Sequence, residues 1–157
     1  MASAAEIRGK ERRIREIMER EGIDALAIST TCNFAWLTGG CSNYVGVMTE
    51  TGAASAVLTR DAKLIVCDNI EAPRIADEEV EGQGFELRTH PWWEPRKDDL
   101  IREIAGDGAL GSDVSFAGAR NVAGAIDTCR FSLVPEEIER YERLGAMTSE
   151  CLTLTAH

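Results

Sequence analysis

Residues 22–40 read Gly-Ile-Asp-Ala-Leu-Ala-Ile-Ser-Thr-Thr-Cys-Asn-Phe-Ala-Trp-Leu-Thr-Gly-Gly, and the rest of the chain is organised around this stretch. Gly22 can adopt the left-handed conformation that ends a helix, and Ile23 can fold back onto the last turn. Ala25–Ile28 is an uninterrupted apolar run, which predicts a strand covered on both faces. Ser29–Asn33 favours a turn, and a second apolar run follows it.

Composition limits the class of protein. The chain has 157 residues, which suits one domain with a single core, and 17 basic against 27 acidic side chains give a net charge of -10. This charge repels phosphate backbones and anionic membranes, so neither nucleic acid nor a membrane is an expected partner. Five scattered cysteines without a C-x-x-C pair predict reduced thiols. Without a long apolar run or a signal peptide in this sequence, we expect a soluble cytoplasmic protein.

The flanking segments alternate between helix and strand patterns. Ser3–Glu6 has the form of a capping box, and it opens a helix with one apolar face. Further strands are expected at 53–59, 63–67, 85–88, 109–111 and 129–133, and helices at about 70–80, from Pro95 to 105, at 116–126 and from Pro135 onward. The first two of these strands read as a hairpin. The pattern predicts an α/β domain, with a mixed sheet of about six strands and helices on both faces.

The order of these elements resembles a known family. A helix ending in Gly22-Ile23-Asp24, a buried strand, and then Asn33-Phe34-Ala35-Trp36-Leu37-Thr38-Gly39 is similar to the start of the amino-terminal domain of the creatinase, prolidase and aminopeptidase P metallohydrolases. Asn69–Arg74, Pro91–Glu94 and Leu133–Ile138 extend the resemblance to a subgroup of Xaa-Pro peptidases. The chain departs from the family at Trp36, often Tyr, and at Val134-Pro135, usually a basic residue followed by Ser or Asp.

The resemblance carries expectations about fold and function. It implies a creatinase-like domain with a ribonuclease H-like motif at 1–134, and at 135–157 the start of a linker helix toward an absent catalytic domain. It implies that this chain is non-catalytic and serves dimerisation and substrate access. The parent would be a dinuclear-metal Xaa-Pro peptidase or creatinase-type hydrolase, with its two divalent metal ions in the absent domain and none in this chain. Expected partners are a second copy and the catalytic domain of the same or a neighbouring subunit.

Three patterns that could carry chemistry have simpler explanations. Gly106–Gly111 matches G-x-G-x-x-G, but a helix precedes the glycines and a strand coincides with them, which reverses the order of a dinucleotide site. His90 and His157 lie far apart without H-E-x-x-H spacing, so no hydrolytic metal site is expected. Cys41 or Ser42 with His90 as base would be a nucleophile, but no G-x-S-x-G elbow occurs.

Aromatic side chains provide the candidate site. Trp36 is expected in the core. Successive side chains on an extended segment point opposite ways, so one of Trp92 and Trp93 is expected at the surface. Exposed Trp and Tyr mark binding sites and interfaces. The candidate residues for contact with substrate or another subunit are therefore Asn43, Tyr44, Trp92 and Trp93, and no catalytic residue is expected.

Two functions from other classes stay open. One is a free-standing α/β module that binds a small amide, guanidino or peptide ligand, and the other is a small hydrolase that uses a cysteine. The coding region downstream of His157 would distinguish the amino-terminal domain of a larger enzyme from the free-standing module. A continuous frame carrying metal ligands would support the amino-terminal domain, and a natural stop would support the module.

Overall fold

The computed structural model describes residues 2–156 and shows a six-stranded mixed sheet with order β4-β3-β2-β1-β5-β6. The strands are β1 (Ala25–Thr30), β2 (Thr51–Thr59), β3 (Lys63–Asp68), β4 (Glu86–His90), β5 (Leu110–Ser112) and β6 (Arg120–Asn121). The helices are α1 (Ala4–Glu21), α2 (Thr31–Thr38), α3 (Ala72–Arg74), the π-helical turn η1 (Ile75–Glu79), α4 (Lys97–Ala105), α5 (Ala123–Arg130) and α6 (Pro135–Thr155). Strand β2 runs antiparallel to β1 and β3, and the other neighbouring strands are parallel. The predicted fold class is confirmed.

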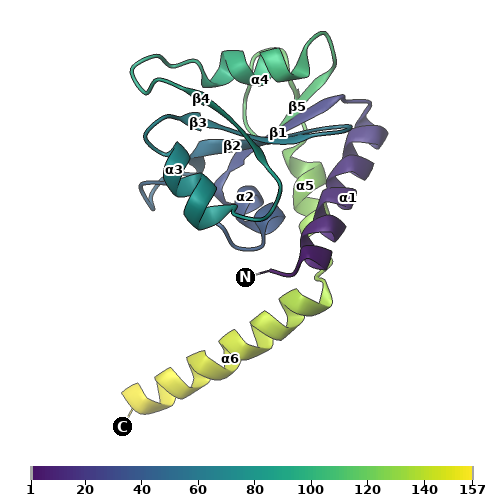
Figure 1. The fold of residues 1–157 in the computed structure, drawn as a ribbon. Helices are drawn as coiled ribbons and strands as arrows, with labels where there is room; N and C mark the ends of the chain where they lie inside the picture. Colours follow the sequence, from purple (N-terminus) through teal and green to yellow (C-terminus); the bar gives the residue numbers. More distant parts are fainter. Residues whose placement is uncertain (1, 157) are drawn as a thin grey trace.

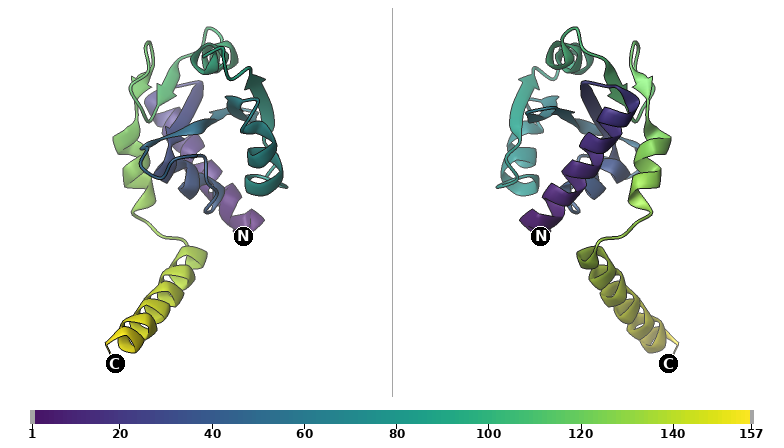
Figure 2. Two further views of the ribbon diagram at one scale, coloured as in Figure 1. Left: turned by 90° about the vertical axis from the view of Figure 1, so that its left-hand side faces the viewer. Right: turned by 90° about the vertical axis from the view of Figure 1, so that its right-hand side faces the viewer.

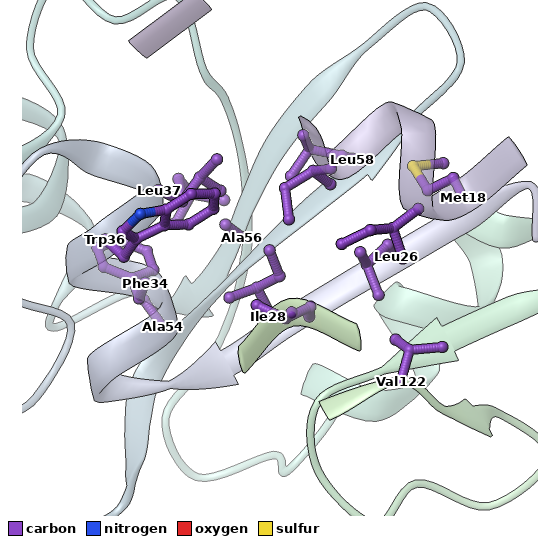
Figure 3. Close-up of a cluster of buried hydrophobic side chains, with 14 of the residues drawn as sticks. Met18, Leu26, Ile28, Phe34, Trp36, Leu37, Ala54, Ala56, Leu58 and Val122 are labelled. Atoms are coloured by element: carbon purple, nitrogen blue, oxygen red, sulfur yellow. The ribbon is translucent and has the colours of Figure 1, made fainter. Parts of the chain in front are cut away.

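Helices cover both faces of the sheet, with β1 at its centre (Figure 1). Leu26 and Ile28 of β1 belong to the larger core, which is shared with α1, α2 and α5 and is drawn in Figure 3. Ala25 and Ala27 point to the opposite face, where they join a smaller core with Ile101 of α4. The prediction of a strand buried on both faces is confirmed, because all four side chains are at most 1% exposed.

The two ends of α1 follow the sequence signals. Ser3 Oγ accepts a hydrogen bond from the backbone N–H of Glu6 at 3.1 Å. Gly22 ends the helix with φ 63°, and the N–H of Ile23 donates to the carbonyl of Met18 at 2.9 Å. Left-handed glycine followed by a buried apolar residue is the usual way to satisfy the last carbonyl groups of a helix. The Glu6 carboxylate does not complete a capping box, because it pairs elsewhere, as described below.

The predicted turn at Ser29–Asn33 is wrong. Strand β1 continues to Thr30, and α2 begins at the next residue. The Asp113 carboxylate accepts hydrogen bonds from the backbone N–H groups of Ser29 (2.7 Å) and Thr30 (3.0 Å). A distant side chain thus satisfies the backbone donors at this junction, where a turn would have satisfied them locally.

The region after β5 also differs from the prediction. The expected helix at 116–126 is a turn with Gly118 at φ 79°, then β6, then the first residues of α5. The expected strand at 129–133 is instead the end of α5, which stops at Arg130, followed by a turn. Strand β6 pairs with β5 and is the sixth strand of the sheet, which the segment at 129–133 is not.

Three other boundaries shift. The predicted helix at 70–80 is the short α3 followed by η1, and the predicted strand at 85–88 begins and ends later as β4. Pro95 precedes α4 instead of lying in its first turn. Helix α6 begins at Pro135 as expected and projects away from the other elements, which we call the body (Figure 2). Within residues 2–156, no helix is long and apolar enough to cross a membrane.

Candidate functional site

Five strands end at one edge of the sheet, which we call the carboxyl edge. Strands β1, β3, β4, β5 and β6 run in one direction, and the antiparallel β2 begins at this edge. The loop at 40–50, which leads into β2, and the turn at 91–96, which follows β4, therefore lie at the same edge of the sheet. Both segments lie on the left-hand side of Figure 1. The topology thus brings the predicted contact residues, which are about fifty positions apart, to the same edge.

Asn43 anchors the loop to the sheet. Its side chain is fully buried, and its Nδ2 donates to the carbonyls of Ala54 (2.8 Å) and Ser29 (3.3 Å). Gly52 packs so closely that a Cβ there would lie 2.2 Å from Asn43 Cγ. In this structure the Asn43 amide therefore makes its contacts inside the fold, and these contacts attach the loop to the end of β1 and the start of β2.

Tyr44 is exposed, and its backbone is held by Arg74. The guanidinium donates to the carbonyls of Tyr44 and Ser42, each at 3.4 Å, and pairs with Glu71 at 2.7 Å and Glu79 at 2.8 Å. The Glu79 carboxylate also accepts from the backbone N–H of Ser42 at 2.6 Å. Two carboxylates thus orient the guanidinium that supports this part of the loop.

The π-helical turn explains how Glu79 reaches Arg74. The N–H of Val80 donates to the carbonyl of Ile75 at 2.9 Å, the i to i+5 bond of a π-helix. The wider turn brings residues five apart onto one face. Sequence reasoning did not find this arrangement. In the loop beside Tyr44, the apolar side chains of Val45, Val47 and Met48 are all strongly exposed.

Trp92 and Trp93 are each 61% exposed, so both side chains reach the surface, whereas one was expected to. They lie in a turn closed by the N–H of Glu94 and the carbonyl of Pro91 at 3.0 Å, and not on an extended segment. The rings meet edge to face, with centroids 6.0 Å apart and planes at 89°. The N–H of Trp92 donates to Asn69 Oδ1 at 2.8 Å, which ties the turn to the end of β3. Both rings are therefore presented together on a held backbone.

Lys97 connects the tryptophan turn to the loop. Its Nζ donates to the carbonyl of Gly52 at 3.3 Å, next to the buried Asn43. Burial lowers the pKa of Lys97, although the charges of Asp98 and Asp68 act in the opposite direction. The two predicted contact segments are thus connected through Gly52 of β2, which accepts from Lys97 and packs against Asn43.

Asn33 also lies at the carboxyl edge, just after β1, and it is held there by Asp113, a contact that the sequence did not predict. Asp113 is buried and accepts from Asn33 Nδ2 at 3.0 Å and from Thr30 Oγ1 at 2.6 Å. Asn33 Oδ1 accepts from Arg130 at 2.9 Å. Trp36 lies one turn further along α2 and is buried in the core, as predicted. The Asn and the aromatic residue of the sequence motif therefore have structural roles at the two ends of one short helix.

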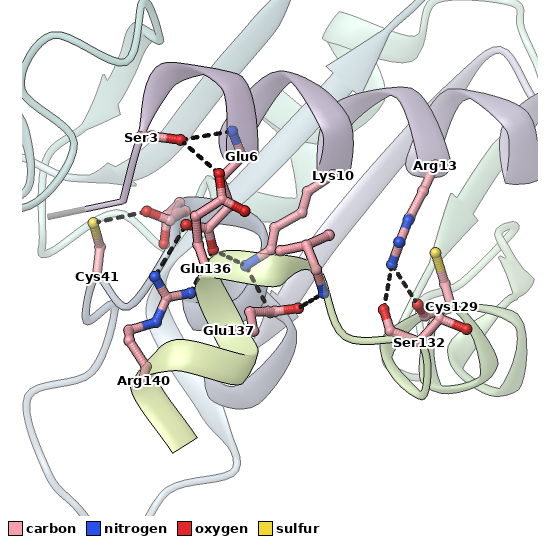
Figure 4. A network of polar contacts seen from close by, with 12 residues as sticks. Ser3, Glu6, Lys10, Arg13, Cys41, Cys129, Ser132, Glu136, Glu137 and Arg140 are labelled. Atoms are coloured by element: carbon pink, nitrogen blue, oxygen red, sulfur yellow. Dashed lines mark hydrogen bonds and ion pairs between the residues drawn. The ribbon is translucent and has the colours of Figure 1, made fainter. Parts of the chain in front are cut away.

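A second polar cluster joins α1 to α6, and we call it the junction cluster (Figure 4). Lys10 is 1% exposed, and its Nζ lies 2.7 Å from Glu6 and 2.9 Å from Glu137. Arg140 donates to both oxygens of Glu6, at 3.0 Å and 2.5 Å. The Lys10 ammonium also lies 5.4 Å from the centroid of the Trp36 ring. This cluster holds the first turns of α6 against the body.

The charge pattern of the junction cluster shifts two pKa values. Burial alone raises the pKa of Glu6, but hydrogen bonds from Arg140 and Lys10 and their positive charges outweigh it, so the pKa is lowered. The hydrogen bond to Glu6 raises the pKa of Arg140. Both shifts favour the charged forms that the ion pairs need.

A groove of about 740 Å³ lies beside this cluster, and we call it the junction groove. Its lining residues are Lys10, Ala35, Trp36, Gly39, Gly40, Asp127, Arg130, Phe131, Leu133, Glu137, Arg140, Tyr141 and Leu144. Its walls come from α1, α2, the end of α5 and the start of α6. The apolar and aromatic members could hold an apolar ligand or another helix.

The other patterns from the sequence do not form a site in the described part of the chain. Gly106 ends α4 with φ 59°, and the later glycines lead into and lie in β5, so these glycines connect a helix to a strand, as expected. His90 ends β4 with its Nδ1 3.0 Å from the carbonyl of Pro91, while Cys41 Sγ lies 2.8 Å from the carbonyl of Glu79. No group of three potential metal ligands occurs among residues 2–156, and His157 lies outside the described residues.

The comparisons with known proteins agree on one class. Residues 11–141 match the Creatinase/Prolidase N-terminal domain, which is most of the chain, so this protein belongs to that family. No curated protein sequence matches.

Solved structures share the fold at low sequence identity. The prolidase of Pyrococcus horikoshii OT3 is 18% identical with a TM-score of 0.67, and the match covers 92% of this chain and 41% of that one. The Xaa-Pro dipeptidase of Bacillus anthracis is 15% identical with a TM-score of 0.60, covering 85% and 38%. A chain of an Xaa-Pro aminopeptidase from Streptococcus pyogenes is 17% identical with a TM-score of 0.53, covering 74% and 90%. This chain thus spans about two fifths of the first two proteins.

Proposed function

We propose that this chain is the non-catalytic amino-terminal domain of an Xaa-Pro dipeptidase or aminopeptidase-like metallohydrolase, where it serves dimerisation and shapes substrate access. Family membership supports this assignment. So does the fact that the matched prolidase is more than twice as long as the part this chain covers. In this proposal the two divalent metal ions belong to the catalytic domain, the chain forms a homodimer, and the protein works in the cytoplasm.

The observation that carries the proposal is the aromatic surface at the carboxyl edge. Tyr44, Trp92 and Trp93 are exposed there together with the apolar side chains of the 45–48 segment. Arg74 holds the backbone carbonyl of Tyr44, Asn69 holds the backbone N–H of Trp92, and Asn43 anchors the start of the loop. Aromatic side chains on a backbone that is already held lose little conformational entropy on binding, which is typical of an interface.

Sedimentation across a concentration series tests the dimer. Truncating one interfacial aromatic side chain costs about 1–4 kcal/mol of binding. Tyr44→Ala or Trp93→Ala should therefore shift the chain toward monomer without changing its circular dichroism. Trp93→Phe, which keeps an aromatic ring, is the matched control and should retain most of the association. A dimer that is indifferent to both alanine variants would refute this surface.

The absence of catalysis is tested separately. The purified chain should not cleave an Xaa-Pro peptide with added Mn²⁺ or Zn²⁺, because a hydrolytic metal has to be held by a ligand set that can activate water. Metal-dependent cleavage that is lost in His90→Ala would contradict the proposal.

The alternative function is a free-standing module for a small amide, guanidino or peptide ligand. The junction groove favours it, since Trp36 and Tyr141 line the groove together with the charged Arg130. Calorimetric titration of an Xaa-Pro dipeptide into the chain would support the module if binding is lost in Tyr141→Ala.

A further inference from the structure

Strand β4 is the outermost strand at one end of the sheet, and its outer edge has no neighbouring strand within residues 2–156. Its pairing with β3 is regular, from Leu64 opposite Glu86 to Asp68 opposite His90, so neither a bulge nor a proline interrupts it. The strand at the other end of the sheet is the two-residue β6, which leads through α5 to α6. Figure 2 shows β4 and α6 on opposite sides of the body. The open edge therefore lies away from α6.

The hydrogen bonds of β4 show which of its backbone groups face outward. The carbonyl of His90 accepts from the N–H of Asn69, just past the end of β3, at 2.9 Å, so the backbone groups of His90 point toward β3. Backbone groups of successive residues in a strand point to alternate sides, so those of Arg88 also point toward β3, and those of Leu87 and Thr89 point away from the sheet. Among residues 2–156, no backbone hydrogen bond outside the β3–β4 pairing involves Leu87 or Thr89. Their N–H and C=O groups are thus free to pair with an added strand.

Two side chains of opposite charge flank this edge. Glu86 and Arg88 are two positions apart, so they project from the same face of β4, and both are exposed. Neither belongs to an ion pair within residues 2–156, whereas Lys63 and Arg96 in the neighbouring segments both do. Charged side chains on an edge strand discourage pairing with arbitrary strands. Here they restrict the partner to a strand that carries the complementary charges.

We propose that β4 binds an extended peptide segment as an added antiparallel strand, and that this segment carries an acidic residue opposite Arg88 and a basic residue opposite Glu86. In peptide recognition by strand addition, backbone hydrogen bonds give affinity and alternate side chains give specificity. From its amino terminus, the segment therefore has the pattern of an acidic residue, any residue and a basic residue. This inference does not rest on the proposed function.

The backbone of β4 favours the antiparallel direction. An antiparallel strand exchanges both hydrogen bonds with residues whose backbone groups face it, which are Leu87 and Thr89. Glu86 and Arg88 then lie at non-hydrogen-bonded positions, where facing Cα atoms are about 4.5 Å apart and side chains are closest. Both charges thus meet their partners at the shortest range. A parallel strand forms evenly spaced, slanted bonds and offers no such close pairs.

A short segment fits this edge better than a second copy of the chain does. Strand β4 itself has the pattern Glu86, Leu87, Arg88, so two copies could pair about a twofold axis at Leu87. However, β4 offers five residues to such a contact, and a stable interface takes about 20–30 residues a side. Each copy also carries a net charge of -10, which opposes close approach. A peptide with one acidic and one basic residue meets no such repulsion.

Fluorescence anisotropy with labelled synthetic peptides tests this pairing on the full chain. The probe is acetyl-Ser-Thr-Glu-Val-Lys-Thr-Ser-amide, whose Glu lies opposite Arg88 and whose Val lies opposite Leu87. Methylating the amide nitrogen of Val removes a donor to the edge and should weaken binding about tenfold or more. Methylating the amide nitrogen of Lys, which points away from β4, is the matched control and should change binding by less than about twofold. No binding of the unmodified probe, or an equal loss from both methylations, would overturn the proposal.

A charge exchange tests the specificity. The probe with Glu and Lys exchanged should bind the wild type about fivefold more weakly, because like charges then face each other. The double variant Glu86→Arg/Arg88→Glu should reverse this preference, and it should keep the fold because both side chains are exposed. Equal affinity of the wild type for the two probes, or no reversal in the double variant, would refute the assigned charges.

Thr89→Pro tests the edge from the side of the protein. Proline removes the outward-facing N–H of residue 89, and the bonds of β4 to β3 stay because they come from the alternate residues. Probe binding should therefore fall about tenfold or more without a change in circular dichroism. Thr89→Val, which keeps the N–H, is the matched control and should bind the probe like the wild type. A wild-type dimer that Thr89→Pro dissociates in sedimentation equilibrium would identify a second copy as the occupant and refute the inference.

Discussion

Strand β1 and helix α6 are held in opposite ways. Strand β1 lies between β2 and β5 and is buried by separate cores on its two faces. Helix α6 meets its own body through the junction cluster, and the rest of its length exposes an apolar side. The conformation of β1 is therefore fixed by packing on both of its faces, whereas among the described residues α6 is held to the body only near its start.

This difference predicts two levels of stability. Segments with many buried contacts open only with the whole domain, and segments with few open locally at much lower free energy. The outer part of α6 should open first, the junction cluster next, and β1 last.

The largest effect is expected for Leu26→Asp at the centre of β1. The side chain is fully buried, and an unpaired charge there costs several kcal/mol, enough to prevent folding. Leu144→Asp on exposed α6 is the matched control and should change the free energy of unfolding of the body by about 0.5 kcal/mol or less. Circular dichroism and denaturant unfolding measure both. A Leu26→Asp protein that unfolds cooperatively would contradict the central position of β1.

An intermediate effect is expected for Lys10→Met in the junction cluster. The change leaves Glu137 and part of the charge of Glu6 without a buried partner, and breaking such a cluster costs about 3–5 kcal/mol. Arg12→Met, on the same helix, removes an exposed pair with Glu16 at 3.7 Å and should cost less than about 1 kcal/mol. Urea denaturation compares the two variants. Equal midpoints would mean that the cluster does not stabilise the attachment of α6.

The sequence predicts the regions whose partners are apolar and close in the chain. Ala25–Ile28 is recognisable because burial on both faces needs an unbroken apolar run, and Gly22 because a helix end needs a left-handed residue. The hairpin formed by β2 and β3 follows from two short apolar runs with a three-residue connection. In each case the physical cause lies within a few residues of its effect.

The remaining features depend on distant partners. Nothing near Thr30 shows that Asp113 will satisfy its N–H, and nothing near Glu6 shows that Arg140 will pair with it. For the candidate site, the exposure of Trp93 follows from the prolines on either side of it, Pro91 and Pro95, whereas the buried role of Asn43 depends on how closely Gly52 packs. One sequence shows which residues are polar, but not which distant groups satisfy them.

The smallest effect concerns the dependence of the junction cluster on pH. The folded protein holds the pKa of Glu6 below its ordinary value, so the cluster contributes its full stability above that value, about pH 4.3. This contribution is lost as the pH falls through the lowered folded-state pKa, because the protonated acid no longer pairs with Lys10 and Arg140. Between pH 5 and pH 3 the wild type should therefore lose more unfolding free energy than Glu6→Gln, which has no such proton to gain.

Urea unfolding of both proteins at each pH gives this difference directly, since the titration of the other carboxylates is common to both and cancels. Glu16→Gln, which alters an exposed carboxylate on the same helix, should lose as much unfolding free energy as the wild type over this pH range. If the wild type and Glu6→Gln lose the same free energy, the ionised state of Glu6 does not hold α6 to the body. The attachment of α6 would then depend on the apolar contacts in the junction groove.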